Sequence, residues 1–416
     1  MDLELLLHRL QEAEAIDGLR EHWNESQACF PQCRPDFLDP DRVCEQRAFA
    51  GLDPALDRPL RSMAERVWAS AELRTLAWHC RRLVFEHLDF PASRLQNLPR
   101  LQRALGDSAG VFYFLIGLDA VPRTRAVHAR RNVPERITRR CFSHFEESLA
   151  LYAMHHAGRP GMNPGSLGWL RNHVKGDLFR LGRFEFMLKP FHGRLRAFRR
   201  RSDGTVLALA EDGVAFDAAG RIARHDAAPA WTARLQIERR GVTGCPISPK
   251  GHALNRTVFL PRSEWDPVLA PGDAILETHI PPGGGMTLER CRNSMAEALD
   301  FFPRTFPESP FVGFACYSWV LNPDLATIYR PSANPVLWQR ELYLFPIPTG
   351  DREGLYFIFG ENDPDPAAAP RDTSLRRALL DHLARGGRLI AGGMFFLTPD
   401  FPRFGQQPYT SSEPIP

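Results

Sequence analysis

Three consecutive glycines, Gly283 to Gly285, stand between an apolar stretch predicted to be a strand and a longer stretch predicted to be a helix. Residues 273–302 have the sequence DAILETHIPPGGGMTLERCRNSMAEALDFF. A glycine-rich turn that opens a helix presents backbone N–H groups without partners at the positive end of the helix dipole. The sequence therefore predicts an anion site at this turn, with a nucleotide or coenzyme phosphate as its natural ligand.

A plainer interpretation of the same residues stays open. A glycine cluster without a fuller motif is a weak signal of phosphate binding. A flexible turn capped by Thr287, with nothing bound, would have the same sequence.

The composition fits a globular chain and argues against a nucleic-acid-binding protein. Of the 416 residues, 44% are hydrophobic and 24% are charged, and this length allows two or three domains. The formal net charge of +3 is too small to predict binding to nucleic acid. Nearly all positive charge is arginine, because lysine occurs only at Lys175, Lys189 and Lys250. Arginine suits anionic ligands, although a codon bias in the genome explains the excess equally well.

We expect a cytoplasmic protein whose cysteines are thiols. No run of about 18 or more apolar residues predicts a membrane span. Residues 1–19 lack the basic start and small-residue cleavage site of a secretory signal. The eight cysteines are therefore not expected to form disulfides.

A metal site near the N-terminus is one interpretation of Cys29, Cys33 and Cys44, which follow His22. Structural zinc sites need four well-placed ligands and usually show tighter pairs of cysteines. We therefore expect no metal here, and interpret the cysteines as small buried side chains in a loop-rich segment.

The first part of the chain predicts a helical domain. Leu3, Leu6, Leu7 and Leu10 recur at helical spacing. Residues 60–88 predict one long helix or two, residues 98–118 predict a buried helix, and the Pro-rich residues 29–59 predict irregular structure. We place the domain boundary in the basic segment 122–132. This gives a helical domain at residues 1–128, a second domain at 129–400 and a loose tail at 401–416.

In the second part, helices are predicted at 134–158 and 166–178, and strands then begin to alternate with helices. Later helices are predicted at 287–302, 323–341 and 373–385. The predicted strands are 183–188, 194–198, 205–210, 233–237, 257–260, 274–280, 311–319, 342–345, 355–359 and 388–397. The whole pattern predicts an α/β (α+β) protein, in which a helical N-terminal domain precedes a mixed β-sheet flanked by helices.

Three segments carry a resemblance to a known family: GDLFRLGRFEF from Gly176, HIPPGGGMTLERCRNSMAEALDFF from His279, and CYSWVLNP from Cys316. Their order resembles the GNAT superfamily of acyl-coenzyme A-dependent N-acyltransferases. More closely, the chain resembles the bacterial acyltransferase family with a helical N-acyltransferase N-terminal domain and a GNAT-like C-terminal domain. The resemblance covers about residues 1–400. It implies acyl-CoA as co-substrate, an amine acceptor and no metal.

The coenzyme motif of the superfamily is Arg or Gln, two residues, Gly, one residue, then Gly or Ala. When Gly283 and Gly285 are placed on its small positions, Ile280 stands where Arg or Gln is expected. The residues that the resemblance assigns to the coenzyme are Ile280, Gly283, Gly284, Gly285, Met286, Thr287, Arg290 and Arg292. The two arginines are equally well explained as an exposed face of the helix.

Glu277 and His279 are the first candidates for catalysis. They alternate with Thr278, so they lie on one face of the predicted strand with Cα atoms about 7 Å apart. A carboxylate and an imidazole beside a coenzyme turn suit general base catalysis. Alternatively, Glu277 pairs with an arginine and His279 only hydrogen-bonds the turn backbone.

The following strand and helix offer further candidates. Tyr317 and Tyr329 are candidates for protonating the leaving thiolate, although tyrosines are equally common as amphipathic parts of a core. Ser318 is a candidate for substrate binding. Cys316 is a conceivable nucleophile, but no sequence feature indicates a lowered pKa, so we expect direct transfer. Glu185 is a candidate for recognising the amine or acting as the base, although an exposed strand carboxylate is the simpler reading.

The leading hypothesis is acyl transfer from acyl-CoA to a small-molecule or peptide amine. One alternative is an inactive coenzyme-sensing or protein-interaction module, motivated by Ile280. Another is a transferase that uses acyl carrier protein as donor, because the arginine-rich segment 123–131 would suit an acidic carrier. For the helical domain two roles stay open, a cover over the acyl channel and a homodimer interface.

Overall fold

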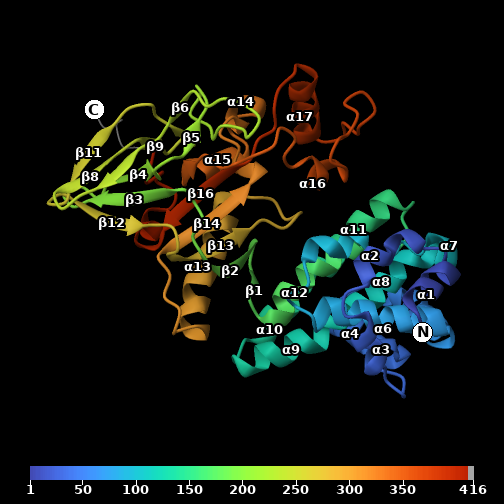
Figure 1. The fold of residues 1–416 in the computed structure, drawn as a ribbon. Helices are drawn as coiled ribbons and strands as arrows, with labels where there is room; N and C mark the ends of the chain where they lie inside the picture. The colour runs from blue at the N-terminus through green and yellow to red at the C-terminus, as the bar shows by residue number, and fades with distance from the viewer. Residues whose placement is uncertain (411–416) are drawn as a thin grey trace. The chain divides into compact units, whose positions relative to one another are not determined.

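The computed structural model describes residues 1–410, and the chain forms two compact units, Met1–Arg180 and Leu181–Pro416. In Figure 1 the first unit runs from blue to green and the second from green to red. We predicted a boundary in the segment 122–132, but this segment belongs to helix α9 (Ala120–Arg130) inside the first unit. The reason is a buried stripe of Val121, Thr124 and His128 at helical spacing, which the surrounding arginines disguise in the sequence.

The first unit is helical, as predicted. Its other helices are α1 (Leu3–Leu10), α2 (Ile16–Leu19), α3 (Trp23–Ala28), α4 (Pro40–Phe49), α5 (Asp57–Ala69), α6 (Ala71–Phe85), α7 (Gln102–Leu105), α8 (Ala109–Gly117), α10 (Glu135–Arg140), α11 (Ser143–His155) and α12 (Leu167–Lys175).

Local capping explains two boundaries that we had not predicted. Ser70 separates α5 from α6, because its hydroxyl accepts a hydrogen bond from the backbone N–H of Leu73 at 3.2 Å. Residues 29–59, which we predicted to be irregular, contain α4. Asp39 caps that helix and Pro40 occupies its first position, where proline is tolerated.

The segment Gln102–Arg130 is long and apolar enough to span a membrane, with a mean hydropathy of 1.4 over its most apolar stretch. Yet 78% of that stretch is buried inside the fold. Every residue of α8 is buried, so its all-round apolar surface is accounted for by packing within the first unit.

Among the described residues, the second unit contains a six-stranded sheet in the order β1-β2-β13-β14-β16-β15. A five-stranded sheet has the order β10-β9-β4-β3-β12, and β11-β8-β7 and β5-β6 form smaller sheets. The strands are β1 (Leu178–Leu181), β2 (Phe184–Pro190), β3 (Leu195–Arg200), β4 (Val206–Ala210), β5 (Ala215–Phe216), β6 (Trp231–Thr232), β7 (Leu235–Ile237), β8 (Gly241–Gly244), β9 (Pro246–Ser248), β10 (His252–Ala253), β11 (Val258–Pro261), β12 (Trp265–Leu269), β13 (Ala274–His279), β14 (Gly313–Ser318), β15 (Tyr343–Phe345) and β16 (Gly392–Leu397).

Helices pack against one face of the six-stranded sheet. They include α13 (Leu288–Thr305) and α15 (Asn334–Arg340). Three further helices, α14 (Leu325–Ile328), α16 (Leu355–Phe359) and α17 (Ser374–Ala384), share a smaller apolar cluster. Trp338 of α15 is fully buried, and its ring centroid lies 5.4 Å from that of Phe184 on β2. On the opposite face, the hydroxyl of Tyr343 donates to the carbonyl of Ile247 at 2.5 Å, which joins the sheet to the five-stranded sheet.

The stretch 323–341, predicted to be helical, contains α14 and α15. Two predictions about the second unit were wrong. Residues 355–359, predicted to be a strand, form α16, which begins and ends at the left-handed Gly354 and Gly360. Residues 401–410 are not loose, since Tyr409 is buried and its hydroxyl donates to the carboxylate of Asp400 at 2.8 Å. Residues 411–416 of the predicted tail lie outside the described residues.

Arg171 of α12 fixes the end of α6 in the first unit. It is 4% exposed, and its Nε donates to the carbonyl of Val84 at 2.9 Å while Nη2 donates to that of Leu83 at 2.5 Å. Nη1 donates to the carbonyl of Phe90. One guanidinium thus pairs carbonyls that a helix end would otherwise leave buried without donors.

We predict that Arg171→Met destabilises the chain by about 3 kcal/mol, because several buried carbonyls lose charged donors. The midpoint of thermal unfolding of the first unit should fall by roughly 6–12 °C. Arg103→Met, at an exposed position of α7, is the matched control and should change little. Equal midpoints for the two variants, by differential scanning calorimetry, would contradict this role for Arg171.

Candidate active site

The strands β13 and β14 begin side by side and then part. Their parallel ladder has only two partner pairs, Leu276 with Phe314 and Glu277 with Ala315. Beyond these pairs β13 stays bonded to β2 as far as His279, and β14 stays bonded to β16 as far as Ser318. Backbone groups on the facing edges are therefore released from the ladder, and such N–H groups are suitable donors to a developing oxyanion.

Polar side chains gather on one face of the sheet at this opening. Residues paired directly across a ladder share a face, and successive residues alternate. Glu185 lies opposite His279, and Glu277 lies opposite Ala315, so Tyr317 also belongs to this face. The structure therefore brings Glu185, Glu277, His279 and Tyr317 to one side of three neighbouring strands.

Glu277 and His279 are in contact, with 3.2 Å between Oε1 and Nε2, and their side chains are 20% and 24% exposed. Burial alone would raise the pKa of Glu277. The hydrogen bond and charge of His279 outweigh burial, so the pKa of Glu277 lies below its usual value. Its partner is thus an imidazole, and not the arginine of the alternative interpretation.

Tyr317 is held by the turn that follows β2. Its hydroxyl oxygen accepts a hydrogen bond from the backbone N–H of His192 at 3.2 Å. Burial raises the pKa of Tyr317 to about 12, and the charge of Glu277 adds to the rise. Gly393, opposite Tyr317 on β16, lets the ring of Phe345 lie against this face, since a Cβ at Gly393 would lie 2.3 Å from that ring.

Glu185 is 2% exposed, so the interpretation of this residue as an exposed strand carboxylate is wrong. The other candidates on or after β14 point elsewhere. Cys316 is buried on the opposite face, where burial raises its pKa. Ser318 caps a short 3₁₀ turn by accepting from the N–H of Val320 at 3.3 Å. The hydroxyl of Tyr329 lies 2.8 Å from that of Ser374, the first residue of α17. Of the two candidate tyrosines, Tyr317 is therefore the one beside Glu277.

The glycine turn follows β13 and is exposed. Gly283, Gly284 and Gly285 have φ values of 76°, 70° and 67°, a left-handed run that other residues rarely adopt. In the part of the chain that the structure describes, the N–H groups of these glycines donate no hydrogen bond. Thr287 caps α13 by accepting from the N–H of Arg290 at 3.3 Å. The turn thus offers free donors at the N-terminus of a long helix.

Two arginines flank the turn, and sequence reasoning found only one of them. Nη1 of Arg290 lies 4.0 Å from the point where a Cβ of Gly285 would lie. Arg183 donates from Nε to the carbonyl of Gly285 at 2.7 Å. Arg292 lies on another side of α13, with its guanidinium 5.3 Å from the ring centroid of Phe401. Of the remaining turn candidates, Ile280 is partly buried and Met286 is buried.

Ser294 explains why Arg183 reaches the glycine turn. Its hydroxyl, buried on α13, accepts from the N–H of Phe184 at 2.9 Å and donates to the carbonyl of Leu181. These two hydrogen bonds hold the tight turn between β1 and β2 against α13. The LGRF sequence signals such a turn, but no sequence signal tells which part of α13 it meets.

Comparison with known proteins supports the fold. A family model described as "N-acyltransferase N-terminal domain" matches residues 39–176, and one described as "GNAT-like C-terminal domain" matches residues 178–395. No curated protein matches the sequence.

Solved structures of acyltransferases share this fold. An acyltransferase in complex with decanoyl-CoA and teicoplanin has a TM-score of 0.62 and 20% identity, over 96% of this chain and 100% of that chain. A mutant acyltransferase in complex with octanoyl-CoA has a TM-score of 0.62 and 19% identity, over 95% of this chain and 99% of that chain.

The two family models cover most of the sequence, and the GNAT-like model alone covers more than half of it. The chain therefore belongs to the family of acyltransferases that join an N-acyltransferase N-terminal domain to a GNAT-like C-terminal domain.

Proposed function

We propose that this acyltransferase moves an acyl group directly from a coenzyme A thioester to an amine. The observation that carries the proposal is the parting of β13 from β14 beside the glycine turn, with Glu277, His279 and Tyr317 on one face of the opening. The similar structures, which hold decanoyl-CoA or octanoyl-CoA, support a coenzyme A thioester as donor.

The glycine turn is the proposed site for the coenzyme pyrophosphate. The N–H groups of Gly283 to Gly285 and the N-terminus of α13 supply donors and positive potential. Arg183 and Arg290 supply positive charge at the two sides of the turn. Arg183 thereby makes up for Ile280, which occupies the position where the superfamily motif has Arg or Gln.

In the proposed reaction the neutral amine attacks the thioester carbonyl, and His279 takes the proton that the nitrogen loses. Glu277 orients the imidazole and stabilises its protonated form. Backbone N–H groups in the opening stabilise the tetrahedral oxyanion. Its collapse forms the amide bond and breaks the carbon–sulfur bond. Glu185, opposite His279, is placed to recognise the amine.

The relative acidities decide which group protonates the leaving thiolate. Tyr317, with a pKa of about 12, is a weaker acid than an ordinary thiol, whose pKa is about 8.5. Proton transfer from Tyr317 to the thiolate would therefore be uphill, whereas the imidazolium of His279 already carries the proton taken from the amine. We assign the proton to His279 and a hydrogen bond to sulfur to Tyr317.

Direct transfer is favoured over an acyl-cysteine intermediate. Cys316 lies on the opposite face of the sheet from His279, and burial raises the pKa of its thiol. A nucleophilic cysteine needs a lowered pKa and access to the substrate.

The acceptor, an alternative carrier-protein donor, a homodimer and a cytoplasmic location stay predictions. The exposed Arg125, Arg130 and Arg131 at the end of α9 are where an acidic carrier would bind. Decanoyl-CoA and teicoplanin are the first substrates to test, because they are bound together in a similar structure.

The function is tested by release of free thiol from decanoyl-CoA with teicoplanin or simpler amines, together with calorimetric titration of the donor. We expect amine-dependent release, and His279→Gln should lower kcat by a factor of about 10²–10⁴ while donor affinity stays unchanged. His252→Gln changes a histidine on β10, outside the proposed site, and is the control that should leave kcat unchanged. Absence of binding by every acyl-CoA tested would refute the proposal, and saturable binding without turnover would favour the inactive module.

The coenzyme site is tested by Arg183→Leu. We predict that the dissociation constant for acyl-CoA rises about tenfold or more, because a charged phosphate contact is lost. kcat at saturating donor should change little. Arg304→Leu removes a charge at the far end of α13 and serves as the control. Unchanged affinity in the Arg183 variant would exclude this residue from the site.

The Glu277–His279 pair also predicts a pH dependence of stability. Since the folded pKa of Glu277 lies below its usual value, the pair stabilises the fold above the unfolded pKa of about 4.3. This contribution is lost as the pH falls through the folded pKa. The difference in unfolding free energy between the wild type and His279→Asn should shrink as the pH falls below about 4.3, measured by urea unfolding. A difference that does not vary with pH would contradict the pairing.

A further inference from the structure

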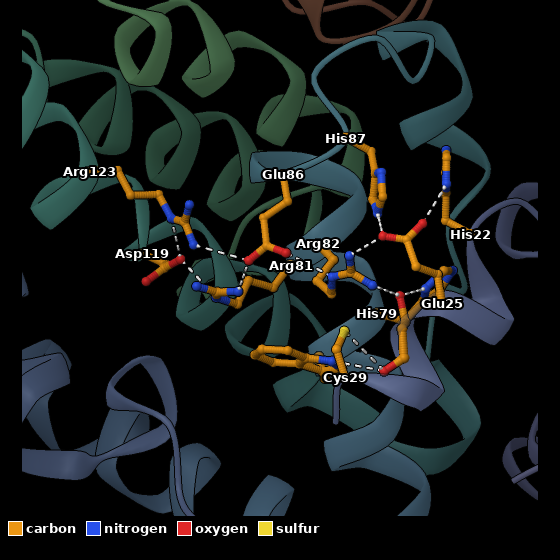
Figure 2. A network of polar contacts seen from close by, with 12 residues as sticks. His22, Glu25, Cys29, His79, Arg81, Arg82, Glu86, His87, Asp119 and Arg123 are labelled. Atoms are coloured by element: carbon orange, nitrogen blue, oxygen red, sulfur yellow. Dashed lines mark hydrogen bonds and ion pairs between the residues drawn. The ribbon is translucent and has the colours of Figure 1, made fainter. Parts of the chain in front are cut away.

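Two histidines and a glutamate from two distant parts of the sequence meet in the first unit. His22 precedes α3, Glu25 lies in α3, and His87 follows the C-terminal end of α6. One ligand atom from each lies within 4.8 Å of the others. Figure 2 shows the carboxylate of Glu25 beside both imidazoles, with a contact to each. In the sequence His22 stands near Cys29 and Cys33, but in the structure its ring stacks on that of His87.

The distances suit a small divalent cation. Two ligands bound at about 2.0–2.1 Å in tetrahedral geometry are about 3.3 Å apart. Nδ1 of His22 lies 3.2 Å from Oε2 of Glu25, and Nε2 of His87 lies 3.7 Å from Oε1. Imidazole and carboxylate ligands together are a donor set that zinc accepts.

The surroundings supply the supporting contacts that metal ligands usually have. Nε2 of His22, the nitrogen away from Glu25, lies 3.5 Å from a carboxylate oxygen of Glu21. Arg82 donates to Oε1 of Glu25 at 2.5 Å and is itself held by Glu86 at 2.7 Å. A carboxylate on the second nitrogen of a histidine and a donor on a ligating carboxylate both orient ligands. Oε2 of Glu25, which lies against Nδ1 of His22, is the oxygen that remains for the cation.

His87 has a buried nitrogen that nothing else satisfies. Among the described residues, Nε2 of His87 is buried and has no hydrogen-bond partner. A buried polar atom without a partner is costly, so a ligand at this point would be stabilising.

We propose that His22, Glu25 and His87 bind a divalent cation of the zinc type, with a water molecule as the fourth ligand. The rings of His22 and His87 are stacked, with centroids 3.7 Å apart and planes 12° apart. Nitrogen lone pairs of parallel rings do not converge, so one ring turns when the metal binds. His22 is the ring that turns, since its side chain is 26% exposed and that of His87 only 12%.

The bound cation links the start of α3 to the end of α6. It therefore stabilises the first unit, and the site is independent of the transfer chemistry proposed above. Cys29 and Cys33 are exposed thiols in the same unit and form the competing ligand set. Cobalt(II) bound by thiolates and cobalt(II) bound by the histidines and the glutamate have different absorption spectra, so an experiment can distinguish the two ligand sets.

The test is titration of the full chain, freed of metal by a chelator, with zinc chloride in a calorimeter. We expect one equivalent to bind and, at a hundredfold excess over the dissociation constant, the unfolding midpoint of the first unit to rise by roughly 5–10 °C. His22→Gln and His87→Gln should each weaken binding by a factor of about 100 or more. Cobalt(II) should give the visible bands of a tetrahedral site without a thiolate charge-transfer band.

Two controls make the outcome decisive. His8→Gln alters an exposed histidine of the same unit, and a Cys29→Ser, Cys33→Ser double variant removes the exposed thiols. Both should bind zinc as the wild type does. The proposal is overturned if no stoichiometric binding occurs, if binding survives both histidine substitutions, or if it is lost with the cysteines. Circular dichroism of each variant verifies that it is folded.

Discussion

The short ladder between β13 and β14 is the constraint on which the active site depends. Only two residue pairs join these strands, yet β2 holds β13 and β16 holds β14 along their lengths. The strands can therefore part without losing their places in the sheet. The opening puts free backbone groups and a row of polar side chains next to each other, and this combination is what acyl transfer to an amine requires.

A second constraint places the coenzyme turn beside the opening. After His279 at the end of β13, the chain passes through Ile280, Pro281 and Pro282 into the three left-handed glycines and then reaches α13. The hydroxyl of Ser294 clamps α13 to the turn before Phe184, which puts Arg183 against the carbonyl of Gly285. The N–H groups of the glycine turn and the polar face of the opening are thus positioned by neighbouring parts of one strand–turn–helix unit.

The sequence was sufficient to predict structure that depends on a local residue pattern. It was not sufficient where contacts between distant residues determine the structure. The strand, glycine turn and helix from 274 to 305 follow from alternation, glycine and helical period, and the structure contains all three. Residues 355–359 are apolar throughout, so their pattern could not distinguish a strand from the helix that two left-handed glycines enclose. The positions of Arg183, and of His87 beside His22, depend on tertiary packing, for which one sequence holds no signal.

The most direct test of the account is a crystal structure of the protein with a non-hydrolysable thioether analogue of decanoyl-CoA. The account predicts the pyrophosphate within hydrogen-bonding distance of the N–H groups of Gly283 to Gly285 and beside Arg183. It also predicts the reacting carbon in the opening between β13 and β14, next to His279 and Tyr317. An analogue bound with its pyrophosphate elsewhere, or with the opening filled by side chains, would contradict it.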